Sequence, residues 1–144
     1  MNSSNQVLFE LTDLKIIEVQ GGDVLHAMKS SDSGFYGFEE AYFSFIDKNY
    51  IKAWKKHKEM TLNLIVPIGS IKFVLLNDKM SKFDIIEIGE NNYKRLTIKP
   101  NVWFGFKGVG QNKNLLLNLS NIIHNPEETE ILPIDSFDFN WSIN

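Results

Sequence analysis

The stretch from Tyr50 to Leu76, YIKAWKKHKEMTLNLIVPIGSIKFVLL, decides the fold class. Its middle part, TLNLIV at positions 61–66, alternates between a mainly polar set of side chains and an apolar set. Successive side chains of a β-strand point to opposite faces, so this alternation is typical of a strand with two different faces. In a two-sheet roll one face packs on a core and the other meets solvent or a ligand cavity. We therefore expect this stretch to form part of a β-sandwich or barrel.

Similar β-rich runs follow one another along the rest of the chain. The runs are Tyr50–Trp54, Met60–Pro67, Ile71–Leu76, Phe83–Ile88, Lys94–Ile98, Trp103–Phe106 and Leu115–Ile123. Residues that tolerate tight backbone separate them at Asn77–Asp78, Gly89–Asn92 and Gly108–Asn114. Short strands at this spacing predict an all-β sandwich or barrel. Short helices are expected only at Phe38–Phe45 and at Pro126–Ile131, the second capped by Asn125.

The composition indicates one globular domain over residues 1–144. A chain of 144 residues can bury one good core. No apolar run approaches the roughly 20 residues of a membrane-spanning helix, and no secretory signal is evident. We expect a soluble, cytoplasmic protein with no membrane partner. The net charge of −3 argues against nucleic acid as a partner, and the absence of cysteine excludes disulfides and thiolate catalysis.

Several segments resemble one protein family. Residues Ile86–Phe106, IEIGENNYKRLTIKPNVWFGF, resemble the segment of dTDP-4-dehydrorhamnose 3,5-epimerases in which an acidic strand and a Glu-Asn turn lead to a Pro-containing loop and Gly-Phe. Ile51–Trp54 stands at the place of that family's Leu-Arg-Gly-Leu, and Asn125–Glu127 resembles its Ala-Pro-Glu. Leu64–Leu76 resembles its two long strands around a Gly turn.

This resemblance implies a fold and a ligand class. The fold is an all-β, cupin-type double-stranded β-helix, that is a jelly-roll barrel, with short peripheral helices. The implied partner is a nucleotide-linked sugar, and no cofactor is expected. The resemblance also places Glu40, Tyr42 and Ser44 among the substrate-contacting residues, although Tyr42 is equally compatible with a half-buried core position.

The sequence departs from the family at its catalytic positions. Lys55 stands where the family's catalytic His directly follows Leu-Arg-Gly-Leu, and His57 comes two residues later. Ile123 and His124 stand where the family has a catalytic Tyr, and Phe104 replaces the His before Gly-Phe. These departures argue against a full two-centre epimerase mechanism. His124 is a candidate ligand contact because it lies beside the position of the missing Tyr.

Lys55 and His57 are the candidate catalytic residues. At positions i and i+2 of a strand they project from one face, with Cα atoms about 6.6 Å apart, so both reach one ligand. Proton abstraction beside a ketone needs a base and a cation or donor for the developing enolate oxygen. His57 suits the first role and Lys55 the second. The alternative is that residues 55–58 form a solvated, charged edge.

Other polar residues are candidates for holding the ligand. Neutral polar groups at fixed strand positions suit hydrogen bonds to sugar hydroxyl groups. The candidates are Thr61, Asn63, Asn118 and Ser120, with an exposed polar sheet face as the alternative. The short basic stretch that begins at Lys52 is suited to a small anionic ligand. The three tryptophans, at 54, 103 and 141, are expected mainly in the core or an interface.

A metal site is not expected. Metal-dependent cupins use a paired His-x-His with a nearby Glu and a third His two strands later. Here the first motif is Lys55-x-His57, and the later segment reads Val102–Phe104. Three imidazoles without the right spacing make a poor transition-metal site.

The preferred hypothesis is a sugar-nucleotide epimerase or isomerase. It acts on a nucleotide-linked 4-keto-6-deoxyhexose through an enediolate, in the synthesis of surface-polysaccharide precursors. A 3,4-ketoisomerase would use the same intermediate and move the carbonyl. A non-catalytic sugar-nucleotide binding protein is the alternative of a different class, motivated by Lys55 and Ile123.

The N-terminal run Gln6–Gln20 leads to a prediction about assembly. It contains β-compatible residues at 7–9 and at 16–17 without an evident local partner. An unpaired edge strand is a liability unless something covers it. The resemblance implies a homodimer in which such a segment adds to the partner's sheet about a twofold axis. Pairing within its own barrel, which leaves a monomer, is the alternative.

Overall fold

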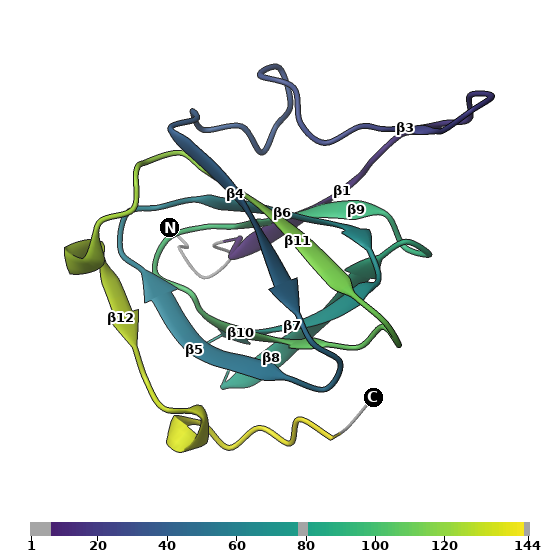
Figure 1. Ribbon diagram of the computed structural model, residues 1–144. Helices are drawn as coiled ribbons and strands as arrows, with labels where there is room; N and C mark the ends of the chain where they lie inside the picture. Colours follow the sequence, from purple (N-terminus) through teal and green to yellow (C-terminus); the bar gives the residue numbers. More distant parts are fainter. Residues whose placement is uncertain (1–6, 78–80, 143–144) are drawn as a thin grey trace.

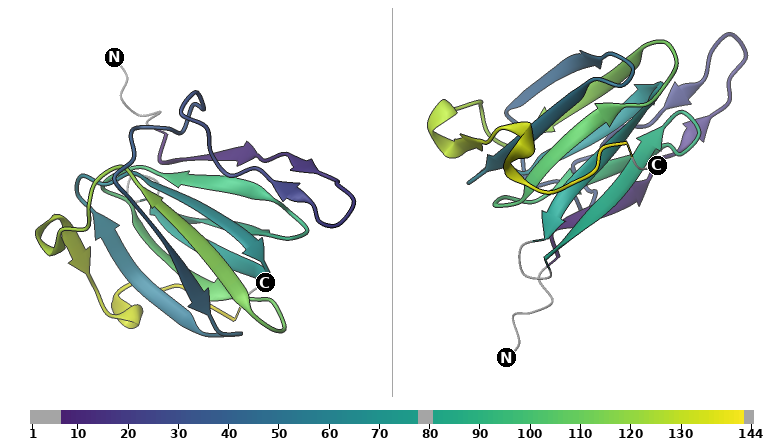
Figure 2. Two further views of the ribbon diagram at one scale, coloured as in Figure 1. Left: turned by 45° about the horizontal axis from the view of Figure 1, so that its top comes forward. Right: turned by 90° about the horizontal axis from the view of Figure 1, so that it is seen from below.

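Two antiparallel sheets face each other and form a barrel (Figures 1 and 2). The computed structural model describes residues 7–77 and 81–142. The first sheet has the order β1-β9-β6-β11-β4 and the second the order β12-β5-β10-β7-β8. The strands are β1 Phe9–Asp13, β2 Ile16–Ile17, β3 Val24–Leu25, β4 Glu40–Ile46, β5 Ile51–His57, β6 Leu62–Ile68, β7 Ser70–Asn77, β8 Lys82–Gly89, β9 Lys94–Ile98, β10 Trp103–Gly108, β11 Asn114–Ser120 and β12 Thr129–Ile131. This is the all-β, cupin-type jelly roll expected from the sequence.

The core lies between the two sheets because the strands present an apolar face to each other. On β6 and β7, Leu64, Val66, Phe73 and Leu75 are almost fully buried and belong to one apolar cluster. The tight turn between these strands depends on Gly69, whose φ is +83°. A Cβ at Gly69 would overlap the carbonyl oxygen of residue 113 and the side chain of residue 114, so only glycine fits.

The predicted strands are confirmed, and one predicted helix is wrong. Residues 38–45 do not form a helix, because Tyr42 and Ser44 point to one side of β4 while Phe43 and Phe45 are strongly exposed on the other. That two-residue period is the period of a strand, and β4 pairs with β11 along its whole length. The expected helix over 126–131 is confirmed only for its first turn, a 3-10 turn at Pro126–Glu128 whose N-cap Asn125 accepts a hydrogen bond from the amide of residue 127. The second half, Thr129–Ile131, is wrong, because it forms strand β12 paired with β5. Asp78 of one predicted turn lies outside the described residues.

The outer face of the first sheet is covered by the segment from His26 to Gly34. Asn63 donates from Nδ2 to the carbonyl oxygen of Gly34, and its Oδ1 accepts from Arg95 Nε at 3.1 Å. Arg95, completely buried, donates to the carbonyl oxygen of Ala27 and pairs with Asp32 at 3.2 Å. A polar network therefore occupies the side of β6 that faces away from the barrel interior.

The outer face of the second sheet is covered by the C-terminal segment, drawn in yellow in Figure 1. Trp54, Trp103 and Trp141 are buried there with Val74. The tryptophans are thus core residues, as predicted. A second 3-10 turn, Ile134–Ser136, lies within this covering segment.

The N-terminal strand has a partner in its own chain. β1 pairs with β9 over its five residues, so the expectation of an unpaired strand is wrong for β1. β2 pairs only with β3, and the two form a hairpin that extends away from the sheets (Figures 1 and 2). Gln6, the first residue of the predicted run, lies outside the described residues. Among the described residues, no helix is long and apolar enough to cross a membrane.

Candidate active site

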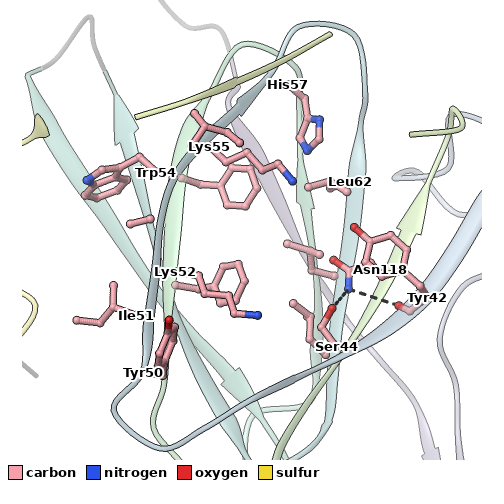
Figure 3. A pocket seen from close by; sticks show the side chains of 16 residues that line it. Tyr42, Ser44, Tyr50, Ile51, Lys52, Trp54, Lys55, His57, Leu62 and Asn118 are labelled. Carbon is pink, nitrogen blue, oxygen red and sulfur yellow. Dashed lines mark hydrogen bonds between the residues drawn. The ribbon is translucent and has the colours of Figure 1, made fainter. Parts of the chain in front are cut away.

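A cavity of about 430 Å³ opens into the barrel between the two sheets (Figure 3). Pockets of this size suit small organic ligands. Strand β5 supplies one wall and β4 and β11 supply the opposite wall. The lining residues are Tyr42, Ser44, Tyr50, Ile51, Lys52, Ala53, Trp54, Lys55, His57, Leu62, Leu64, Phe104, Phe106, Leu116, Asn118 and Ile131.

Both predicted catalytic residues lie on the cavity wall. Lys55 and His57 occupy alternate positions of β5, and Lys55 pairs directly with Phe104 of β10. His57 is buried and its ring stacks on that of Phe104, with 6.2 Å between the ring centroids. The arrangement differs from a solvated charged edge, in which both side chains would face away from the barrel.

Lys52 points into the same cavity, although regular alternation would place it on the opposite face from Lys55. The pairing register between β5 and β10 shifts, so that Gly105 is opposite Ala53 while Phe104 is opposite Lys55. Trp54 is the extra residue of this β-bulge, a feature that re-aims the side chains around it. Figure 3 shows the ammonium groups of Lys52 and Lys55 on the same side of the strand.

His57 has a buried carboxylate partner. Its Nδ1 lies 2.5 Å from Oε1 of Glu128, which is almost fully buried. The other carboxylate oxygen of Glu128 accepts from the main-chain amides of Glu59 at 3.0 Å and Met60 at 3.2 Å. These contacts fix the carboxylate and, through it, the imidazole ring.

The charges of this pair follow from its surroundings. Burial raises the pKa of Glu128, but the hydrogen bonds from His57 and the two amides outweigh burial and hold the pKa at about 2. Burial lowers the pKa of His57, and the nearby Lys55 lowers it further against the opposing effect of Glu128. Glu128 is therefore a carboxylate near neutral pH and His57 is a neutral imidazole. Nδ1 then carries the proton that it donates to Glu128, which leaves the lone pair of Nε2 for a ligand.

The opposite wall carries hydroxyl and amide groups. Asn118 donates from Nδ2 to the hydroxyl oxygen of Ser44 at 3.3 Å and to the carbonyl oxygen of Tyr42 at 3.4 Å (Figure 3). Burial raises the pKa of Tyr42, and the neighbouring Glu40 raises it further, so its phenol stays protonated. Tyr42 is 43% exposed, which leaves its hydroxyl group accessible to a ligand.

The remaining predicted residues lie at the rim or elsewhere. Glu40 accepts a hydrogen bond from the amide of His124 at 2.7 Å, at an exposed position outside the cavity lining. Ser120 is opposite Glu40 on β11, and its buried Oγ has no hydrogen-bond partner among the described residues. Asn63 faces away from the cavity into the Arg95 network. The predicted grouping of Thr61 and Asn63 with Asn118 is therefore wrong, because Leu62 and Leu64 form this part of the wall.

A solved structure decides the family. The chain is 34% identical to a dTDP sugar isomerase from Desulfovibrio desulfuricans G20, with a TM-score of 0.87, and the match covers 92% of this chain and 90% of that one. The chain belongs to the family of dTDP-sugar isomerases.

Two further proteins are similar to the chain, although no protein-family model matches it. The chain is 27% identical over 135 residues to a probable low-salt glycan biosynthesis epimerase, Agl13, from Haloferax volcanii, covering 88% of this chain and 86% of that protein. QdtA, a sugar 3,4-ketoisomerase from Thermoanaerobacterium thermosaccharolyticum solved with TDP, shares the fold at 23% identity and a TM-score of 0.73, with 85% and 86% of the two chains covered. The resemblance to sugar-nucleotide epimerases predicted from the sequence is thereby confirmed.

The isomerase-family cavity contains residues that sequence reasoning missed. Glu128 is not among the residues proposed from the sequence, because its contact with His57 is not visible there. The Asn-Pro-Glu-Glu turn was the available signal, because a carboxylate is needed to orient a catalytic imidazole. Tyr50, Phe104 and Phe106 also line the cavity. Among residues 7–77 and 81–142, no three His, Cys, Asp or Glu side chains come together in a way that would hold a metal ion.

Proposed function

We propose that this protein is a sugar-nucleotide isomerase or epimerase acting on a nucleotide-linked 4-keto-6-deoxyhexose. The pairing of His57 with Glu128 on the cavity wall carries the proposal. A neutral imidazole held by a buried carboxylate is suited to remove a proton from carbon. Family membership supports the same reaction class.

The charge of the cavity supports an anionic ligand. Lys52 and Lys55 point into it, and none of the described residues that line it is Asp or Glu. Within the described part of the chain, neither lysine forms an ion pair with a carboxylate. Two uncompensated cations in a chain of net charge −3 favour the diphosphate or the enolate oxygen of a nucleotide sugar.

His57 starts the proposed reaction by taking the proton from the sugar carbon beside the ketone. The C–H electron pair becomes the C3–C4 double bond, and the carbonyl π electrons move onto O4. The Lys55 ammonium stabilises this developing oxyanion. Electrostatic stabilisation of this kind is often the largest single contribution to the rate enhancement by an enzyme. The product of the step is an enediolate and a protonated His57.

Return of the proton determines the product. Protonation of C3 from the opposite face gives the C3 epimer and restores the ketone at C4. The phenol of Tyr42, on the wall opposite β5, is the proposed donor because its raised pKa keeps it protonated. A second turnover at C5 would need a corresponding donor for that carbon.

A 3,4-ketoisomerase is the second candidate, and one observation favours it. The described residues place a single imidazole–carboxylate pair in the cavity, on the β5 wall. If the C3 hydroxyl passes its proton to the O4 oxyanion and His57 returns its proton to C4, the carbonyl moves from C4 to C3 and a hydroxyl group remains at C4, without a second base. The structural likeness to QdtA is compatible with this reaction.

A non-catalytic sugar-nucleotide binding protein is the third candidate. It was suggested by Lys55 and Ile123, which replace catalytic residues of the epimerases. The His57–Glu128 pair weakens this candidate, since binding alone does not need a buried carboxylate behind His57. Thermal stabilisation by ligand without proton exchange would support binding alone.

The experiment that separates these candidates follows the sugar protons by NMR in deuterated water. With dTDP-4-keto-6-deoxyglucose, an epimerase incorporates deuterium at C3 or C5 and keeps the C4 ketone. A 3,4-ketoisomerase gives the 3-keto sugar. No exchange with this or other nucleotide-linked 4-keto sugars would contradict both enzymatic candidates.

We also propose the setting in which the protein acts. A single domain over residues 1–144 works in the cytoplasm, in the synthesis of surface-polysaccharide precursors, because nucleotide sugars are the activated donors for such polymers. A homodimer is proposed from the β2–β3 hairpin, whose apolar residues Ile16, Ile17, Val24 and Leu25 are 39% to 49% exposed. An isolated two-stranded hairpin is marginally stable in water, so a second copy is the proposed cover.

A further inference from the structure

The bulge in β5 is held by the C-terminal segment, whose residue Leu132 continues the pairing of β12 with β5. The main-chain amide of Trp54 donates to the carbonyl oxygen of Leu132 at 3.0 Å, and the amide of Leu132 donates back to the carbonyl oxygen of Trp54 at 3.0 Å. The indole Nε1 of Trp54 donates to the carbonyl oxygen of Ile134, also at 3.0 Å. Three hydrogen bonds therefore connect the one extra residue of the bulge to residues 132–134.

Aromatic packing adds to this connection. The ring of Trp54 lies 5.2 Å from that of Phe137 and 5.4 Å from that of Trp141, measured between centroids. It also stacks on Phe83 at 6.0 Å. Trp54 is only 1% exposed, and Figure 3 shows its ring pointing away from the cavity. The side chain therefore contributes to the outer cluster, while its main chain lies at the cavity wall.

The bulge also depends on close approach of β10. Gly105 is opposite Ala53, and a Cβ at Gly105 would come within 2.5 Å of the Ala53 Cβ. The glycine at 105 therefore lets β10 approach β5 closely beside the bulge.

The orientation of Lys52 follows from this geometry. Phe106 and Phe104 line the cavity from alternate positions of β10, and they pair with Lys52 and Lys55 respectively. Lys52 and Lys55 are three positions apart, so a regular strand would turn them to opposite faces. The bulge at Trp54 is what brings both ammonium groups to one side.

We propose that Trp54 is a positioning residue for Lys52, and that residues 132–134 hold it in that role. Through Trp54 the C-terminal segment sets the position of Lys52, which binds the diphosphate, relative to Lys55, which faces the developing enolate oxygen. The inference rests on the proposed function only in assigning a nucleotide-linked sugar as the ligand. Its test uses binding of TDP, so it does not depend on whether the enzyme turns over.

The test is a double-mutant cycle on TDP affinity, measured by isothermal titration calorimetry. Trp54→Phe removes the indole hydrogen bond to Ile134 and is expected to weaken TDP binding several-fold. Lys52→Met is expected to weaken it roughly tenfold, the loss of one charge-assisted contact. If Trp54 acts through Lys52, the double variant binds TDP as weakly as Lys52→Met alone.

Trp141→Phe is the matched control, because it changes the same aromatic cluster. Its indole N–H has no hydrogen-bond partner among the described residues. We expect it to lower the melting temperature without changing TDP affinity. Equal losses of affinity in Trp54→Phe and Trp141→Phe would indicate a general packing effect and overturn the proposal.

Leu132→Pro keeps the tests decisive if Trp54→Phe does not fold. It removes the amide that donates to the carbonyl oxygen of Trp54 and leaves every aromatic ring in place. The proposal is supported if Leu132→Pro weakens TDP binding and the double variant with Lys52→Met binds TDP as weakly as Lys52→Met alone. Additive losses with Lys52→Met, unchanged TDP affinity in Leu132→Pro, or no TDP binding by the wild-type protein would contradict it. If the double-mutant cycle on TDP affinity gives the predicted result but the wild-type protein does not isomerise the sugar, only the proposed reaction is contradicted.

Discussion

His57 and Glu128 are 71 residues apart in the sequence, yet Nδ1 of one lies 2.5 Å from Oε1 of the other. Strand β12 begins directly after Glu128 and pairs with β5, with Thr129 opposite His57. The amide of Lys58 donates to the carbonyl oxygen of Glu128 at 2.7 Å. The backbone pairing of β12 with β5 therefore places the Glu128 carboxylate beside His57.

Replacing Glu128 by Gln should lower the proton-exchange rate. A neutral amide can donate to Nδ1, which favours the tautomer with its proton on Nε2 and removes the lone pair that acts as base. We expect a loss within the roughly 10²- to 10⁴-fold range of general base catalysis, measured by NMR in deuterated water. Glu127→Gln is the matched control, since Glu127 is exposed. Equal rates for Glu128→Gln and wild type would contradict the role of the pair.

The activity should survive below the usual pH range of histidine bases. Burial and the Lys55 charge lower the pKa of His57 below its ordinary value of 6.5. The base form then predominates at pH 6.5 and above, and kcat/KM should fall only as the pH drops through the lowered pKa. A pH profile of kcat/KM checks this. An acid limb centred above pH 6.5 would show that His57 is not the titrating base in the free enzyme.

Lys55→Met should change both the rate and the pH profile. Loss of the oxyanion partner is expected to reduce kcat by roughly 10²-fold. Because Lys55 lowers the pKa of His57, its removal should also move the acid limb to higher pH. Lys56→Met is the control, since Lys56 pairs with Glu130 at 3.5 Å near the surface and should have little effect. A reduced rate with an unmoved acid limb would argue against direct coupling of Lys55 to His57.

The proposed dimer can be tested through the β2–β3 hairpin. Sedimentation equilibrium at micromolar concentration should give twice the chain mass of 16.6 kDa. Replacing Ile17 and Val24 by Ser removes apolar surface from the hairpin and should shift the species toward one chain mass while β1 stays paired. A wild-type protein that sediments as a monomer would reject the dimer.

The strand pattern could be predicted from the sequence because side-chain alternation is local. The helix expected at 38–45 is the exception, because Tyr42 and Ser44 alternate with Phe43 and Phe45 as in a strand. The sequence also predicts the wrong face of β6 for the cavity, since Leu62 and Leu64 line it and Asn63 does not. Alternation separates Asn63 from Leu64, but it does not reveal that the segment ending at Gly34 covers the polar side.

Two features of the site depend on contacts that a linear pattern does not contain. Lys52 joins Lys55 only because the register of β5 against β10 shifts at Trp54. Glu128 reaches His57 only because β12 returns to pair with β5. By contrast, the shared face of Lys55 and His57 follows from a spacing of two residues within one strand, so the sequence predicted it.

The central claim is that His57 removes a carbon-bound proton of the sugar. The most direct measurement compares deuterium incorporation into dTDP-4-keto-6-deoxyglucose by wild type and His57→Asn, with TDP affinity measured on the same samples. We predict exchange at C3 in the wild type, and at least a 10²-fold slower rate in His57→Asn, with TDP affinity retained. Exchange by His57→Asn at the wild-type rate would contradict the account.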